Sequence, residues 1–216
     1  MLVPRHHNLR TYIRRQAEQS PGLLLSGCFF AMVDFNYWLD CTSAASPMRD
    51  QVLFQEQLCL LSRGFLMPLV AHNPWVDIKE HEASLKTVEW AIQEHGCVGV
   101  KIYPPMGFFP YGNNKIVFND PDQSRPNLQE LGKRLAALYE LCESLEVPVM
   151  AHANESNGRN TPEDDIAGPL GWRTADTLLS NVKTLSSMLA ISAAPRHTSE
   201  ARCQIRAATG PTSSPR

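Results

Sequence analysis

The chain has 216 residues, of which 43% are hydrophobic and 19% charged, a composition typical of soluble globular proteins. A single domain with a sizeable core is expected, although a full eight-unit (β/α) barrel typically needs about 250 residues. The formal net charge of −2 excludes a strong general attraction to nucleic acid. No apolar run approaches the roughly 18 residues that a membrane-spanning helix needs. We therefore expect neither nucleic acid nor a membrane as a partner.

Residues 1–22 precede the first strand signal and are expected to be helical or irregular. Leu23–Val33 is a continuous apolar run, as in a strand that is buried on both faces of a parallel sheet. A signal peptide is the alternative, but the run lacks the small-residue cleavage pattern. Ser46 is placed to cap a helix with Pro47 at its first position, and Gly64 ends that helix.

The same alternation continues through the middle of the chain. Phe65–Val70 is the second predicted strand. A helix is predicted for Val76–His95, because Leu85, Val88 and Ile92 lie on one face and Gly96 lies just past its end. Val98–Tyr103 is the third predicted strand. Residues 104–126 form a long loop rich in Gly, Pro and Asn, and loops of this length usually have a function.

Asn127 and Glu130 resemble a capping box, and leucines then recur at helical spacing. Val147–Ala151 is the fourth predicted strand, and a short helix is expected at 172–185. A strand–helix period of roughly 30 to 45 residues thus repeats over 23–185, which predicts an α/β fold of about four consecutive βα units, a partial (β/α)₈ barrel.

Residues 186–216 depart from this alternation. They contain four arginines and one glutamate, are rich in Ala, Ser, Thr and Pro, and show no amphipathic period. We expect a disordered tail, or non-native sequence that follows a frameshift or a gene truncation.

Six cysteines are scattered through the chain without a Cys-x-x-Cys pair: Cys28, Cys41, Cys59, Cys97, Cys142 and Cys203. Most lie in apolar runs, where a free cysteine behaves as a small hydrophobic residue. Reduced thiols and a cytoplasmic location are therefore expected rather than a disulfide framework.

Two predicted strand ends carry candidate chemistry. Lys101 lies inside an apolar strand, which is costly unless its amine reaches water, a partner or a metal-bound group. His152 closes the fourth strand, and barrels place catalytic residues and metal ligands at strand carboxyl ends. The structural alternatives are a lysine that extends past the strand end and a core histidine bonded to a carbonyl.

Four further residues follow the same strand ends and are weaker candidates for a substrate pocket: Asp34, His72, Tyr103 and Asn154. His72 could equally be a loop residue without a role in the site. The sequence contains no phosphate-binding loop, dinucleotide fingerprint or serine nucleophile elbow. The candidate site therefore depends on the strand ends alone.

The segments Gly99–Phe108 and Val147–Asn154, with a helix ending Leu-Tyr-Glu-Leu-Cys142 between them, resemble the amidohydrolase-related branch of the amidohydrolase superfamily. The strand that ends in Asp34 and the aromatic residues after it look like the second barrel strand of that family. The resemblance implies a (β/α)₈ barrel of which strands two to five are present, with one or two divalent metal ions, zinc first among them, at the carboxyl ends of the strands.

By this resemblance Lys101 occupies the strand-four position, where some members carry a carboxylated lysine, and His152 occupies the strand-five position of a metal ligand. The implied activity is a metal-dependent hydrolase that acts on C–N or C–O bonds of a small-molecule substrate through a metal-activated water. The chain has no His-x-His pair, and His197 lies in the tail. Because a catalytic zinc site normally takes three protein ligands, we expect an incomplete metal site.

Two other readings stay open. The first is a lyase, either a metal-dependent decarboxylase of the same family or an enzyme that forms a Schiff base on Lys101. The second is an inactive truncated remnant. Half a barrel exposes two edges of a parallel sheet, so this reading predicts marginal stability, aggregation or assembly as a homo-oligomer.

Overall fold

The computed structural model describes residues 5–37, 46–106, 108–110, 113, 128–152 and 188–191. In chain order its elements are α1 (Arg5–Gln19), β1 (Cys28–Ala31), α2 (Met48–Leu61), β2 (Leu66–Ala71), α3 (Pro74–Lys79), α4 (Ala83–His95), β3 (Gly99–Ile102), the 3-10 helix η1 (Pro104–Met106), α5 (Leu128–Ser144), β4 (Val149–His152) and β5 (Met188–Ile191).

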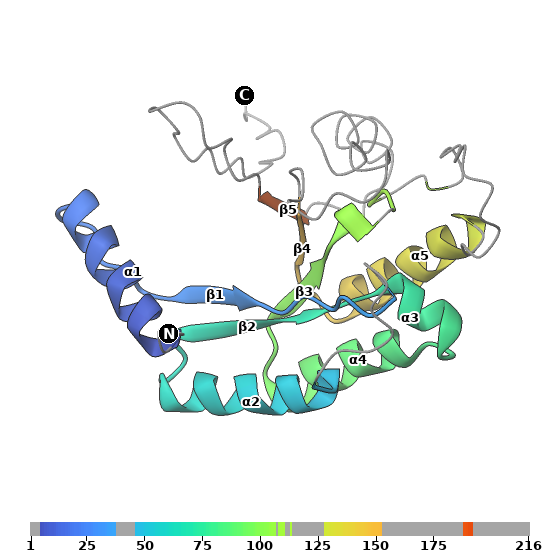
Figure 1. Cartoon of the computed structure of the whole chain (residues 1–216), viewed down its shortest axis with the longest axis horizontal. Helices are drawn as coiled ribbons and strands as arrows, with labels where there is room; N and C mark the ends of the chain where they lie inside the picture. Colours follow the sequence, from blue (N-terminus) through green and yellow to red (C-terminus); the bar gives the residue numbers. More distant parts are fainter. Residues whose placement is uncertain are drawn as a thin grey trace, which may run out of the picture.

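The five strands form one sheet in the order β1-β2-β3-β4-β5, as Figure 1 shows. Every neighbouring pair is parallel. The steps from β1 to β4 pass through α2, then α3 and α4, then η1 and α5. Sequential parallel strands joined by helices are consecutive βα units. The fold is therefore α/β, a partial (β/α) barrel, which confirms the predicted fold class.

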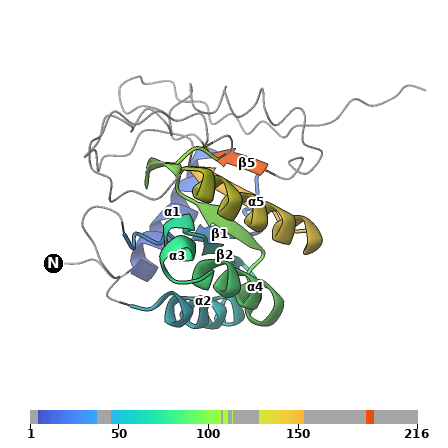
Figure 2. The ribbon, with the colours of Figure 1, turned by 90° about the vertical axis from the view of Figure 1, so that its right-hand side faces the viewer.

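One face of the sheet packs against helices, and we call it the outer face (Figures 1 and 2). Val70, Val100 and Val149 lie side by side on it in β2, β3 and β4. They are buried in one core cluster with Val88 of α4 and Leu135 of α5. Because burial of each such side chain contributes roughly 1.5–3 kcal/mol, this layer supplies much of the stability of the fold.

The opposite face is the inner face. Successive side chains in a strand point to opposite faces, so Leu69, Ala71, Gly99 and Lys101 lie on the inner face, together with Met150. Ala71 is in register with Lys101, and Lys101 with Met150. The inner face therefore carries the first candidate residue.

The single helix predicted between the second and third strands is in fact two helices, α3 and α4. Asn73 caps α3, since its Oδ1 accepts a hydrogen bond of 3.0 Å from the backbone N–H of Trp75, and Pro74 holds the first helical position. The chain then turns at His81 and Glu82, whose φ angles are 51° and 65°. The prediction missed this break because no glycine or proline marks it.

The N-terminal helices and strand are of the types predicted from the sequence, but their first and last residues differ from the prediction. A helix, α1, lies within residues 1–22, as one of the two expectations had it. The first strand is shorter than predicted, and Pro47 rather than Ser46 is the N-cap of α2, without a side-chain cap hydrogen bond. A proline already restricts its own φ to a suitable range, so the helix starts there without a hydroxyl cap.

β5 corrects one expectation. It lies within 186–216, where we expected a disordered or non-native tail, and pairs with β4 so that Val149 is in register with Met188 and His152 with Ile191. For these four residues the expectation of disorder was wrong, because so short an apolar run shows no periodicity that separates it from loop. The non-native origin of the tail stays a prediction. The rest of the tail and the helix expected at 172–185 lie outside the described residues.

None of the helices in the described part of the chain is long and apolar enough to cross a membrane. The cysteines that the structure describes are free thiols: Cys28, Cys59, Cys97 and Cys142. Burial raises the pKa of the Cys97 and Cys142 thiols to about 12, so both are protonated and behave as apolar core residues.

Candidate active site at the strand ends

Lys101 is the third residue of β3 and lies between Ala71 of β2 and Met150 of β4 on the inner face. Only 8% of its surface is exposed. Burial lowers the pKa of its amine from 10.5 to about 8, and the shift comes from loss of hydration rather than from a neighbouring charge. A substantial fraction of this lysine is therefore neutral at slightly alkaline pH, in the form that acts as a nucleophile or a base.

The inner face is closely packed on the amino-terminal side of Lys101. A Cβ atom added to Gly99 would lie 2.7 Å from the Pro148 carbonyl oxygen and 3.0 Å from Leu69 Cδ2. No room is left there for a long side chain. This packing closes the amino-terminal direction to the Lys101 side chain, whereas the carboxyl ends of the strands form the mouth of a (β/α) barrel.

An aromatic row (Phe35, Tyr103 and His152) crosses this end of the sheet. The Tyr103 ring centroid lies 4.8 Å from that of His152 at an interplanar angle of 48°, and 5.7 Å from that of Phe35 in an edge-to-face arrangement. Phe35 is 44% exposed, whereas Tyr103 and His152 are half-buried. Met150 is in register with Lys101, and His152 follows Met150 by two positions in β4, so the row lies just beyond the lysine toward the carboxyl ends of the strands.

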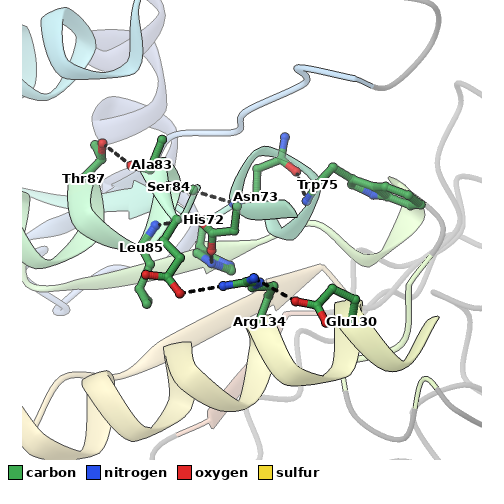
Figure 3. A network of polar contacts seen from close by, with 11 residues as sticks. His72, Asn73, Trp75, Ala83, Ser84, Leu85, Thr87, Glu130 and Arg134 are labelled. Carbon is green, nitrogen blue, oxygen red and sulfur yellow. Dashed lines mark hydrogen bonds and ion pairs between the residues drawn. The ribbon is translucent and has the colours of Figure 1, made fainter. Parts of the chain in front are cut away.

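His72 follows β2 directly but belongs to the outer layer. Its Nε2 lies 2.7 Å from Oδ2 of Asp77 in α3, and both side chains are fully buried. Oδ1 of Asp77 in turn accepts a hydrogen bond of 2.8 Å from the backbone N–H of Leu85 in α4. His72 thus joins β2 to α3 and α4, near Leu85 in Figure 3, and these contacts give it a structural role. Its role in a substrate pocket stays a prediction.

Asp34 lies near His72 rather than near Lys101. It is 6% exposed, and its Oδ1 accepts a hydrogen bond of 2.9 Å from the Asn36 backbone N–H. Burial raises the pKa of its carboxyl group, and the Asn36 hydrogen bond partly opposes this shift. The Asn73 side chain donates to the Asn36 carbonyl oxygen at 2.9 Å, which ties the segment after β1 to the start of α3.

The structure therefore separates the sequence candidates into two groups. Lys101, Tyr103 and His152 come together on the inner face, while Asp34 and His72 lie with the α3 junction. Asn154, the remaining candidate for a substrate pocket, lies outside the described residues.

Sequence reasoning missed three residues that shape these groups. Phe35 extends the aromatic row, and Asn73 and Asp77 fix α3. The Asn73-Pro74 pair was a usable signal, because Asn followed by Pro is typical of a helix start. Asp77 had none, since an acidic residue on a short helix is normally solvated.

The described residues do not fit a complete divalent metal centre. A catalytic zinc site normally takes three protein ligands. Within the part of the chain that the structure describes, no group of three His, Cys, Asp or Glu side chains is placed to hold an ion. His152 supplies one imidazole at the inner-face site and Lys101 one amine.

No family model matches the chain, and no curated protein matches its sequence. Among solved structures it is similar to an amidohydrolase II, with 14% identity over 82% of this chain and 53% of that one and a TM-score of 0.43. It is also similar to 2,6-dihydroxybenzoate decarboxylase from Rhizobium and to a decarboxylase of that name in complex with 2,6-dihydroxybenzoate. Each shows 13% identity over 67% of this chain and 43% of that chain, with TM-scores of 0.37 and 0.38.

The chain thus spans about half the length of the solved structures that it resembles. At this identity and overlap, neither protein identifies a substrate or a functional residue of this chain. The residues on the inner face remain the basis for any functional assignment.

Proposed function

We propose that this chain carries part of the active site of a hydrolase that acts on C–N or C–O bonds of a small carbonyl-containing substrate, as in the amidohydrolase superfamily. One observation carries the proposal: Lys101, Tyr103 and His152 lie together on the inner face, at the strand ends where (β/α) barrels place their active sites. In this proposal the aromatic row borders the substrate and Lys101 contacts its carbonyl or carboxylate group.

The proposal includes a divalent metal ion, zinc, bound through His152. The other protein donors would come from residues outside the described ranges or from sequence outside this chain, since the described donors do not suffice. Bound zinc would polarise the substrate carbonyl and activate a water. We expect the chain alone to bind zinc weakly and to lack hydrolase activity.

Zinc competition against a chromophoric chelator tests this role of His152. His152→Ala should weaken zinc binding at least about tenfold, whereas His81→Asn should leave it unchanged. His81 is a suitable control because it is exposed and far along the chain from the site, and because asparagine tolerates its φ of 51°. Equal zinc affinity of the His152→Ala variant and the wild type would rule out the ligand role.

A second candidate is a lyase that forms a Schiff base on Lys101, and the pKa of about 8 specifically favours it. The neutral amine would attack the carbonyl carbon of the substrate, and the resulting carbinolamine would lose water to leave an imine. Borohydride reduces such an imine to a stable secondary amine. Pyruvate with borohydride at pH 8 should therefore label Lys101 in preference to the exposed Lys86, as mapped by peptide mass spectrometry. Labelling that follows exposure alone would reject this candidate.

The inactive remnant is the third reading, and the same two experiments separate it from the others. It predicts neither a zinc site that depends on His152 nor preferential labelling of Lys101. A cytoplasmic location is likewise a proposal, which the free thiols of the described residues support. Fractionation of the cells that express the chain would test it.

A further inference from the structure

Helix α2 presents a row of large apolar side chains to solvent. Leu53, Phe54, Leu60 and Leu61 are 42%, 59%, 65% and 80% exposed, and the exposed Gln57 lies among them. At 3.6 residues per turn these five positions occupy one face of the helix. We call this face the α2 stripe (Leu53, Phe54, Gln57, Leu60 and Leu61).

The opposite half of α2 faces the rest of the molecule. Its buried and half-buried residues are Met48, Gln51, Val52, Gln55, Glu56, Leu58 and Cys59. Val52 belongs to the core cluster, and Glu56 lies 3.1 Å from His95 of α4. The α2 stripe, opposite this half, therefore points away from the sheet, and α2 itself lies at the margin of the ribbon in Figure 1.

Because the α2 stripe points away from the sheet, a neighbouring helix of the same fold would not cover it. A further βα unit added beside β1 would pack its helix against the flank of α2, because neighbouring helices in such a fold lie side by side on the outer face of the sheet. The outward side of α2 would stay exposed. Contiguous apolar surface of this kind marks an interaction site with a separate molecule.

The α2 stripe is symmetric about Gln57. Leu53 and Leu61 lie four residues before and after it, and Phe54 and Leu60 lie three residues before and after it. In an antiparallel pair of α2 helices with a two-fold axis at Gln57, Leu53 would therefore face the partner's Leu61, and Phe54 the partner's Leu60. A two-fold interface requires such a self-complementary surface.

The charges at the two ends of α2 match the same arrangement. Asp50 lies on the stripe side in the first turn, and the exposed Arg63 follows the last turn. Antiparallel packing brings Asp50 close to the partner's Arg63 at both ends of the contact. Arg49 does not disturb this match, because its guanidinium lies 4.6 Å from the Trp90 ring centroid and is directed to α4.

We propose that this chain forms a two-fold symmetric homodimer by antiparallel packing of its α2 stripes. The occupant of the stripe is thus a second copy of the chain. The central Gln57 pair sets the register, as a single polar residue does in helical dimers. The dimer leaves the inner face free, so it does not depend on the proposed activity.

Sedimentation velocity of the full chain over a range of concentrations tests the dimer. The wild type should show a reversible monomer–dimer equilibrium. Leu60→Glu should raise the dimer dissociation constant at least about tenfold, whereas Leu24→Glu, at an exposed leucine outside the stripe, should not. Circular dichroism and thermal melting of each variant check that it is folded. A wild type that stays monomeric, or equal loss of dimer in both variants, would overturn the proposal.

A charge exchange tests the antiparallel arrangement. Asp50→Lys alone should weaken the dimer, and Asp50→Lys combined with Arg63→Asp should restore it, because the two charges then meet with their signs reversed. A double variant weaker than either single variant would contradict the arrangement. A stripe that binds a different protein instead would show a monomeric wild type and no response to the exchange.

Discussion

Buried polar side chains have partners in one region of this molecule, the junction of helices around Asp77, and lack a charged partner among the described residues in another, the inner face around Lys101. The junction of α3, α4 and α5 is formed by His72, Asn73, Asp77, Ser84, Leu85 and Arg134, of which all but Asp77 are labelled in Figure 3. There the buried His72 and Asp77 are paired at 2.7 Å, and Asp77 also accepts a hydrogen bond from the Leu85 backbone N–H. On the inner face, Lys101 is almost as deeply buried, yet among the residues that the structure describes no opposite charge offsets its loss of hydration. Paired groups of this kind hold a fold together, whereas a desolvated cation lowers stability and is typical of a functional site.

The junction is not fully paired. His72 Nδ1 and Arg134 Nε are buried without a hydrogen-bond partner among the described residues. The Asn73 backbone N–H, by contrast, donates to Ser84 Oγ at 2.9 Å, and Arg134 contacts Glu82 and Glu130 at 2.6 and 2.7 Å. The contrast with Lys101 is thus one of partners: Asp77 and Arg134 of the junction each have a described side chain as a partner.

The largest effect is expected from breaking the buried pair. Asp77→Ala leaves His72 and the Leu85 N–H buried without their acceptor, so the free energy of unfolding should fall by about 3–5 kcal/mol. Urea denaturation followed by circular dichroism measures the loss. Glu89→Ala, at an exposed position of α4, is the control and should change the same quantity by less than about 0.5 kcal/mol. A similar loss in both variants would contradict the structural role of the pair.

The second prediction concerns the pH dependence that Lys101 confers. Its folded pKa of about 8 lies below the unfolded value of 10.5, so the unfolded chain binds more protons between these two pH values. Stability should therefore rise with pH over this window, by on the order of 3 kcal/mol, and the gain is absent below pH 8. Denaturation at a series of pH values measures it.

Lys101→Met provides the control for this prediction. The variant should lose the rise above pH 8 and should be more stable than the wild type at pH 7, because a similar volume is buried without a charge. Lys86→Met, at an exposed lysine of α4, should keep the rise. An unchanged pH profile in Lys101→Met would show that the lysine is better hydrated than its burial indicates.

The third prediction tests how firmly the inner face supports Lys101. In Gly99→Ala the new methyl group would meet the Pro148 carbonyl oxygen at 2.7 Å, and backbone cannot easily move, so we expect a loss of about 1–3 kcal/mol. In Gly27→Ala the contact at 2.7 Å is Met67 Cε, the end of a flexible side chain, and the loss should be below about 1 kcal/mol. Equal losses would show that the backbone at Gly99 and Pro148 can shift as easily as the flexible side chain of Met67.

Sequence alone was sufficient for the strands that form the centre of the sheet. Continuous apolar runs located β2, β3 and β4 to within a few residues, because strands buried on both faces need no alternation. The same reasoning placed Lys101 and His152 at strand ends, which the structure confirms, while their chemical roles stay predictions.

The orientation of side chains at those strand ends could not be predicted. A shift of one position moves a residue to the other face, so His72 belongs to the outer layer and Lys101 to the inner face, although both are near the ends of their strands. The partner of His72 lies in α3, a short helix that is separated from α4 by two non-glycine residues with positive φ, His81 and Glu82. Neither feature leaves a pattern in a single sequence.

The smallest effect is expected at the solvent-exposed border of the junction. Arg134 is 25% exposed and bridges Glu82 and Glu130, of which Glu82 is 48% exposed, so water screens both ion pairs. Arg134→Lys keeps the charge, gives up one of the two contacts and removes the buried Nε that has no partner among the described residues. These changes oppose one another, and the free energy of unfolding should change by less than about 1 kcal/mol in urea denaturation. A loss of unfolding free energy as large as that of Asp77→Ala would contradict this prediction. It would show that the partly exposed ion pairs of Arg134 stabilise the junction as much as the buried His72–Asp77 pair does.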